Sequence, residues 1–448
     1  MKKSICLIAL SIFCSPLAFG TTLEQALVQT YQTNPTLKSA REQAKATDEL
    51  VPQALSGWRP SLFANGDLTY LDSDTDPEAP ADGSNTSKDM SLTVEQPIYR
   101  GGATIASTKS AKNQVKASHE NLRATENTVL LSAVQAYIDV IRDQAILELN
   151  IKNEEVLTKN LEATTARFEV GELTKTDVSQ SEARLSNSKA NVITARGNLN
   201  SSIAVYQSII GESPADLQTP NVEKLKLPKS ENEAIEMAMQ NNPDIISASY
   251  LNEAGIAEID NAYSNILPKV TLTGSVSKTY DPTKDIDDKE VSSIKANLSI
   301  PLYQSGQATS QIRQAKHNSN KRKIEIISNK KTVRSNTVSA WQDYQTAKSN
   351  TTARKDQIKA NEIALNGVME EELVGSRTIL DVLDAEEDLL DSKVELVKAQ
   401  RDTIFKSYEL LSQVGNLTAK NLSLPTEYIN AVDNYKKVKD KWWGVSID

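Results

Sequence analysis

Hydrophobic and polar positions alternate along two matched pairs of short segments. In the first pair, apolar residues or glycine occupy every second position in 62–70 and in 90–94. The same alternation returns in 270–276 and in 294–300. A period of two is typical of β-strands with one apolar and one polar face. We therefore predict four strands of about ten residues, the length of a tilted membrane strand.

Two long stretches without proline indicate helices. Residues 98–213 and 302–424 contain no proline and are rich in Ala, Lys, Glu, Gln, Asn and Leu, which favour helix. Each is expected to break at one glycine, Gly171 or Gly375, in a tight turn or helix cap. The part from 103 to 170 alone would be about 100 Å long.

A sparse apolar stripe runs along the first of these helices. Val140, Leu147, Leu161 and Phe168 share one seven-residue register, with Glu154 as the gap. A seven-residue spacing favours coiled-coil packing. The many Ala and Ser residues nearby allow close helix approach and suit a wall one helix thick.

The chain repeats itself, which indicates an internal duplication. Asn34-Pro35 matches Asn242-Pro243 at an offset of 208 residues, and ten of the 38 positions in 23–60 are identical to their partners. Farther on, Pro97-Ile98-Tyr99 matches Pro301-Leu302-Tyr303 at an offset of 204. Each repeat would contain a first helix, a β-hairpin and two long helices. The first helices are predicted over 23–55 and 231–266, with the Asn-Pro pair interrupting or beginning each.

These boundaries predict four parts of the chain. Residues 1–20 resemble an export signal, because Lys2 and Lys3 precede a short apolar run and Ala18-Phe19-Gly20 offers small residues for cleavage. Cleavage after Gly20 would remove both cysteines, and the residues before Cys14 do not suit lipid modification. Repeat one is assigned to 21–228, repeat two to 229–424 and a periplasmic tail to 425–448.

Composition narrows the function. The net charge of −9 excludes a general electrostatic grip on nucleic acid. Only 39% of residues are hydrophobic and 5% aromatic, so the chain is expected either to bury less apolar surface per residue than a compact enzyme or to bury it in lipid or between subunits. The two histidines, His119 and His317, do not correspond under the repeat, and each is expected at the surface. We find no clustered nucleophile, base or metal ligand set, and predict neither an enzyme nor a cofactor.

Two interpretations of the strands stay open at this point. An ordinary antiparallel sheet packed on a helix would show the same alternation. A membrane sheet would also show it, but four strands cannot close a barrel and open edges are not tolerated in lipid. The membrane interpretation therefore requires several copies of the chain.

Three motifs resemble the TolC family of outer-membrane export channels. They are Asn34-Pro35, the segment Gln96 to Gly102 (QPIYRGG) and the segment Val374 to Ala385 (VGSRTILDVLDA). The resemblance covers residues 23–424 and favours the TolC-like branch over the lipoprotein branch. It implies an α+β membrane protein in which three chains form a 12-stranded β-barrel, continued by a long periplasmic α-helical coiled-coil tube.

The resemblance also implies a function and partners. It implies an exit duct in the outer membrane for type I protein secretion, multidrug efflux or both, with its helical part in the periplasm. A periplasmic adaptor and an inner-membrane pump of ABC or RND type would open it, with the adaptor contacting the helical tips at Gly171 and Gly375. The alternative is a periplasmic adaptor or another exported coiled-coil interaction protein. An exported enzyme is third.

The resemblance assigns roles at the periplasmic entrance. Asp381 and Asp384 are three residues apart on a predicted helix and share a face. They match the pair of aspartates that narrows the entrance in the family. Arg377 matches an arginine that holds the entrance closed, and Thr176 and Asp177 match its partners. Glu372 stands where the family has a tyrosine, and either contacts Arg377 or faces solvent.

Two further motifs have weaker interpretations. The acidic segment 72–89 resembles the start of a calcium loop, but Pro77 and Gly83 occupy positions that require glycine and glutamate. We interpret it as a solvated outer loop, with no metal. The pair Trp442-Trp443 is either an interface anchor or the end of a packed segment.

Overall fold

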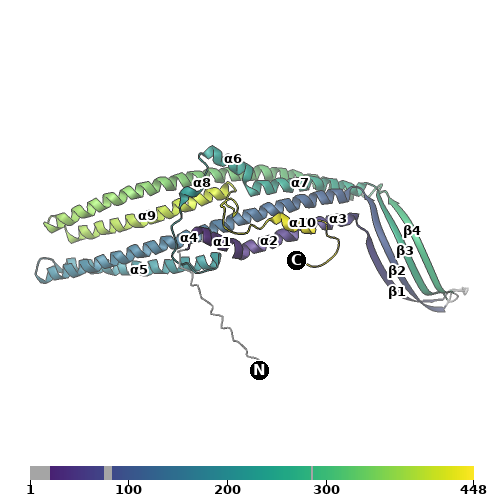
Figure 1. Cartoon of the computed structure of the whole chain (residues 1–448), viewed down its shortest axis with the longest axis horizontal. Coiled ribbons are helices and arrows are strands. Elements are labelled where there is room, and N and C mark those ends of the chain that lie inside the picture. The colour runs from purple at the N-terminus through teal and green to yellow at the C-terminus, as the bar shows by residue number, and fades with distance from the viewer. Residues whose placement is uncertain (1–20, 75–82, 284–285, 448) are drawn as a thin grey trace, which may run out of the picture.

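The computed structural model describes residues 21–74, 83–283 and 286–447. The chain is elongated, with two long helical hairpins at one end and a β-sheet that bends away at the other (Figure 1). The predicted export signal 1–20 and residues 75–82 of the acidic segment lie outside the described residues. The rest of that segment is mostly strand rather than loop, because it extends the first β-hairpin.

The element order repeats along the chain, as the duplication predicts. The first series is α1 (Leu23–Thr33), α2 (Pro35–Asp48), α3 (Leu50–Leu55), η1 (Ser56–Trp58), β1 (Ser61–Ser73), β2 (Gly83–Arg100), α4 (Ala103–Glu169) and α5 (Lys175–Ile210). After η2 (Val222–Lys224), the second is α6 (Glu231–Asn241), α7 (Pro243–Tyr263), η3 (Ser264–Ile266), β3 (Lys269–Thr283), β4 (Ile286–Ser299), α8 (Gln307–Leu373) and α9 (Ile379–Gln413). Helix α10 (Ala431–Val438) follows. The exact repeat boundaries stay a prediction.

The two Asn-Pro pairs interrupt the first helix of each repeat. Asn34 caps α2 by accepting a hydrogen bond from the Thr36 backbone N–H at 2.9 Å, and Asn242 caps α7 in the same way. Their side-chain amides also donate to the last turn of the hairpin, Asn34 to the Ile209 carbonyl and Asn242 to the Gln413 carbonyl. One residue type therefore ends one helix, begins the next and attaches both to a long hairpin. A second break, at Glu49, was not predicted.

The main hydrophobic core lies midway along the helical body. It is formed where α1, α4, α5 and α9 meet the segment 417–424. Tyr137 is fully buried there, and its hydroxyl lies 2.6 Å from the Thr21 carbonyl oxygen and 2.8 Å from that of Gln218. The predicted apolar stripe is only partly buried within one chain: Val140 is buried, whereas Phe168 is exposed. No helix among the described residues is both long enough and apolar enough to cross a membrane.

The four strands form one antiparallel sheet in the order β1-β2-β3-β4. They contain 13, 18, 15 and 14 residues, longer than predicted because polar residues extend both hairpins. Pairing brings the apolar sides of all four strands onto one face: Leu62 lies opposite Val94, Val94 opposite Gly274 and Gly274 opposite Ile294. The polar residues between them share the other face. Within the described residues, β1 and β4 each pair on one side only.

The predicted surface position is wrong for one of the two histidines. His317 is exposed, as expected, but His119 is mostly buried. Its Nε2 lies 2.9 Å from Oδ1 of Asp48, a carboxylate that is fully buried. The other oxygen of Asp48 accepts a hydrogen bond from the Asn434 side-chain amide of α10 at 2.8 Å. Asp48 therefore joins α2, α4 and the tail.

Candidate functional site

The tips of the two helical hairpins lie at the end of the molecule farthest from the sheet (Figure 1). Gly171 follows α4 with φ +85°, and Gly375 follows α8 with φ +78°. An added Cβ at either glycine would meet nothing within 4 Å, so only the backbone conformation requires glycine. This arrangement confirms the predicted glycine turns.

A matching capping box begins the returning helix of each hairpin. The Asp177 carboxylate accepts hydrogen bonds from the backbone N–H and the hydroxyl of Thr174, both at 2.8 Å. Asp381 makes the same pair with Thr378, at 2.9 and 2.8 Å. These bonds satisfy helix-terminal donors. The backbone N–H of Thr378, and then its hydroxyl, hold the pKa of Asp381 below its ordinary value.

Arg377 binds carboxylates of its own hairpin. Its Nε lies 2.9 Å from Oε2 of Glu371, and its Nη1 lies 3.9 Å from Oδ1 of Asp381. Thr176 and Asp177 belong to the other hairpin, and among the described residues of one chain they make no contact with Arg377. The proposed clasp is therefore not formed within one chain.

Glu372 does neither of the two things that the sequence suggested. Its Oε1 lies 2.8 Å from Nη1 of Arg167 in α4, and its side chain is only 11% exposed. Arg167 also faces Glu172, with Nε and Oε2 3.4 Å apart. Glu372 therefore joins α8 to α4 and is unavailable to Arg377 in this conformation, because Arg167 lies close enough to satisfy its charge.

The second aspartate of the predicted constriction contacts an arginine that sequence reasoning missed. The Arg184 guanidinium, in α5, forms ion pairs with Asp384 and with Glu387, one turn later in α9. Asp384 keeps 56% of its side chain exposed. Leu157, Leu185 and Leu383 form a small buried cluster between the same hairpins. Only this three-dimensional packing brings Arg184 to Asp384, because 200 residues separate them.

Another contact between the hairpins buries a carboxylate. Both oxygens of Glu386 accept hydrogen bonds from the Asn160 amide, at 3.0 and 2.9 Å. Burial raises the pKa of Glu386, and the Asn160 hydrogen bonds partly oppose this shift. Within the described part of the chain, no three acidic, histidine or cysteine residues are placed to hold a metal ion.

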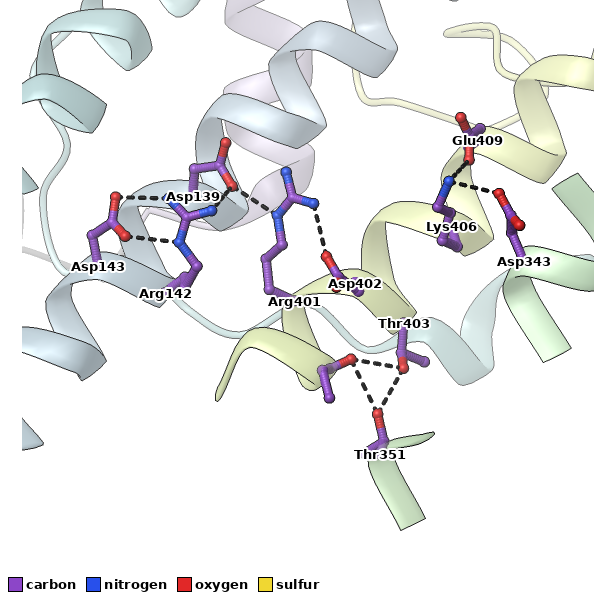
Figure 2. A network of polar contacts seen from close by, with 11 residues as sticks. Asp139, Arg142, Asp143, Asp343, Thr351, Arg401, Asp402, Thr403, Lys406 and Glu409 are labelled. Atoms are coloured by element: carbon purple, nitrogen blue, oxygen red, sulfur yellow. Dashed lines mark hydrogen bonds and ion pairs between the residues drawn. The ribbon is translucent and has the colours of Figure 1, made fainter. Parts of the chain in front are cut away.

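A polar network joins the hairpins nearer the core (Figure 2). Asp139 of α4 accepts from Nη1 of Arg142 at 2.9 Å and from Nε of Arg401, in α9, at 2.7 Å. Within the second hairpin, Lys406 of α9 lies 2.8 Å from Asp343 of α8 (Figure 2). These paired contacts make each chain a unit of two connected hairpins.

Comparison with known proteins decides the family. A family model described as "Outer membrane efflux protein" matches residues 26–212 and 234–416, one segment in each repeat. The chain belongs to the outer membrane efflux protein family. This is a family of channels in the outer membrane rather than a family of enzymes.

Individual relatives extend over nearly the whole chain. The outer membrane efflux protein BepC of Brucella suis is 34% identical over 96% of this chain and 92% of its own length. The outer membrane protein TolC of Escherichia coli is 28% identical over 94% and 88%. The crystal structure of the Campylobacter jejuni CmeC outer membrane channel superposes with a TM-score of 0.78 at 17% identity, covering 93% of this chain and 89% of that one. These likenesses confirm the predicted fold and the outer membrane location.

The capping box of α9 yields a pH prediction. The pKa of Asp381 is depressed in the folded state, so its contribution to the start of α9 is present above the ordinary aspartate pKa and lost as the pH falls through the depressed value. We expect the amide protection of Thr378 and Asp381 to fall over that range, measured by hydrogen–deuterium exchange with correction for intrinsic rates.

A matched pair of variants controls this experiment. Thr378→Ala removes the cap and should increase opening of these amides roughly fivefold at neutral pH, with a weaker pH step. Thr174→Ala removes the equivalent cap of α5 and should leave the amides of Thr378 and Asp381 unchanged. Equal protection in Thr378→Ala and the parent would contradict the assignment.

Proposed function

We propose that three copies of this chain form one exit duct through the outer membrane. The observation that carries the proposal is the four-stranded sheet with two single-sided edges, β1 and β4, and one apolar face. Unpaired backbone groups are too costly in lipid, so neighbouring copies must pair with both edges. Three chains supply twelve strands around a polar interior, and their helical hairpins continue as a tube in the periplasm.

We place the constriction of this duct at the hairpin ends. Asp381 and Asp384 lie near the start of α9, and three chains would contribute six carboxylates around one axis. Crowded carboxylates attract cations. Arg184 lies against Asp384 and Arg377 against Asp381, so the arginines of each chain partly offset this charge. The net charge of the ring therefore depends on the balance of carboxylates and arginines.

The gate clasp would form between neighbouring chains. Arg377 is half-exposed beside Glu371, and on the other hairpin Thr176 is exposed and Asp177 is partly exposed. In a closed ring, the second hairpin of one chain adjoins the first hairpin of the next. Arg377 could then exchange Glu371 for Asp177. Glu372 contributes indirectly, because its pair with Arg167 fixes α8 against α4.

A passive duct requires partners for energy and opening. We propose that a periplasmic adaptor contacts the exposed tips at Gly171 and Gly375, and that an inner-membrane pump of ABC or RND type supplies the energy. The cargo would be proteins in type I secretion, small toxic compounds in efflux, or both. The alternative, a periplasmic adaptor, explains the helical hairpins but gives no role to the sheet with its shared apolar face.

The double variant Asp381→Ala with Asp384→Ala tests the constriction. Removing the carboxylates should relieve block by divalent cations, because these groups are the proposed binding site. The measurement is single-channel conductance in planar bilayers as divalent cation is added. Asp356→Ala with Glu325→Ala removes equal charge from exposed positions of α8 and should leave the block unchanged. Equal block in both double variants would remove the ring from the proposal.

Arg377→Ser tests the clasp. The substitution removes an ion pair between neighbouring chains, so the entrance should loosen and the conductance should rise. Arg334→Ser, at an exposed position of α8, serves as the control and should conduct like the parent. Conductance of Arg377→Ser equal to that of the parent would exclude Arg377 from the gate.

A further inference from the structure

The tail beyond α10 is attached where the helical body meets the sheet. Nη1 of Arg59 donates to the Lys441 carbonyl at 2.8 Å, and the guanidinium lies 4.8 Å from the centre of the Trp442 ring. Arg59 precedes the first residue of β1 by only two positions. Lys441 and Trp442 are therefore fixed beside the point where the first strand begins, and Figure 1 shows the chain then turning back toward the helical body.

The segment after this attachment folds into a turn. Nζ of Lys441 donates to the Ser446 carbonyl at 2.7 Å, and Gly444 has φ +111°. The turn presents apolar side chains outward: Trp443 is 94% exposed, and Val445 and Ile447 are almost fully exposed. Exposed apolar side chains gathered in one short turn indicate an interaction site rather than scattered surface residues.

The level at which the helices meet the sheet has the composition of a membrane interface. Aromatic side chains are exposed at the ends of the helices and strands where the helical body meets the sheet. Bilayer interfaces are enriched in such rings. These residues are Trp58, Tyr99, Tyr263 and Tyr303. Basic residues lie at the same level: Arg100 ends β2 and is paired in register with Lys269, the first residue of β3.

The charge of the tail also suits an anionic lipid surface. Residues 433–441 contain four lysines and two aspartates, a net charge of +2 in a chain whose net charge is −9. Lys437 and Lys436 are exposed on α10. Basic residues beside a membrane are attracted to anionic headgroups, and tryptophan combines an apolar ring with a hydrogen-bonding N–H suited to that depth.

We propose that the turn 442–447 inserts into the periplasm-facing leaflet of the outer membrane. Trp443, Val445 and Ile447 would enter the headgroup region, and the exposed Lys436 and Lys437 would face anionic phospholipid headgroups. The turn would add an anchor beside the sheet and fix the helical body relative to the bilayer. This inference rests on the sheet lying in the membrane, as the proposed function requires.

Tryptophan quenching tests the proposal in the full-length channel. The parent has four tryptophans, at 58, 341, 442 and 443. A variant with Trp58, Trp341 and Trp442 replaced by phenylalanine keeps only Trp443. In vesicles of phosphatidylethanolamine and phosphatidylglycerol, brominated acyl chains should lower its emission roughly twofold relative to unbrominated lipid, because bromine quenches rings at that depth.

Two further variants separate this inference from the proposed function. A variant that keeps only Trp341, which packs beside the cluster of Ala234 and Ala238, should not be quenched. A tryptophan-free chain with Leu92→Trp, on the apolar face of β2, reports insertion of the sheet itself. Quenching at 92 without quenching at 443 overturns the anchor alone. No quenching at 92 overturns the membrane sheet and the proposed function with it.

The state of an unquenched Trp443 identifies what replaces the lipid. Blue emission that is the same in detergent and in vesicles means that a second copy of the chain covers the ring, and overturns the proposal. Red emission with strong quenching by acrylamide means that the ring lies in water, and also overturns it.

If the tryptophan variants do not assemble, Trp443→Cys with Cys6 and Cys14 replaced by serine gives a second test. The thiol should react more slowly with a membrane-impermeant maleimide in vesicles than in detergent, and equal rates would contradict the anchor.

Discussion

The backbone hydrogen bonds of β1 and β4 set the constraint on which the rest of this structure depends. Each of these strands pairs on one side within the chain, and neither edge can stay unpaired in lipid. Assembly is therefore a requirement of folding in the membrane rather than an addition to it. It also fixes the stoichiometry of everything attached to the sheet, including the hairpins and their tips.

The helical body is subject to a different constraint, because it must form a thin wall with little apolar surface. Polar contacts supply much of the connection between its hairpins, from Arg401–Asp139 near the core to Arg184–Asp384 and Arg167–Glu372 toward the tips. Exposed ion pairs such as Arg184–Asp384 each contribute little, about 0–1 kcal/mol. A wall connected by many weak pairs can therefore exchange partners near its end while the buried core around Tyr137 stays fixed.

Local pattern predicted the elements well because strands, caps and turns depend on neighbouring residues. Alternation identified all four strands and their shared face, the Asn-Pro pairs identified helix starts, and Gly171 and Gly375 identified the hairpin turns. The contacts of Glu372, Asp384 and His119 were missed, because their partners lie 205, 200 and 71 residues away. Such pairs depend on how hairpins rotate against each other, which periodicity in one sequence does not encode. The break at Glu49 was also missed, although Pro52 signals it, because proline has no N–H to donate to the Asp48 carbonyl and its ring clashes with that carbonyl in a continuous helix.

Oxidative cross-linking between β1 and β4 tests the central claim most directly. The chain used lacks Cys6 and Cys14. One cysteine replaces Asn65 in β1. A second replaces, one variant at a time, alternate polar-face residues of β4 around Asn297, so that the series scans the register. Within one chain β1 and β4 are separated by two strands, about 14 Å in all, so the disulfide cannot form internally. The account predicts that, at one register, oxidation gives covalent dimers and trimers and no larger species. A chain with only one of the two cysteines should give no product beyond random dimer. Monomers at every register, or a ladder that continues beyond three chains, would contradict it.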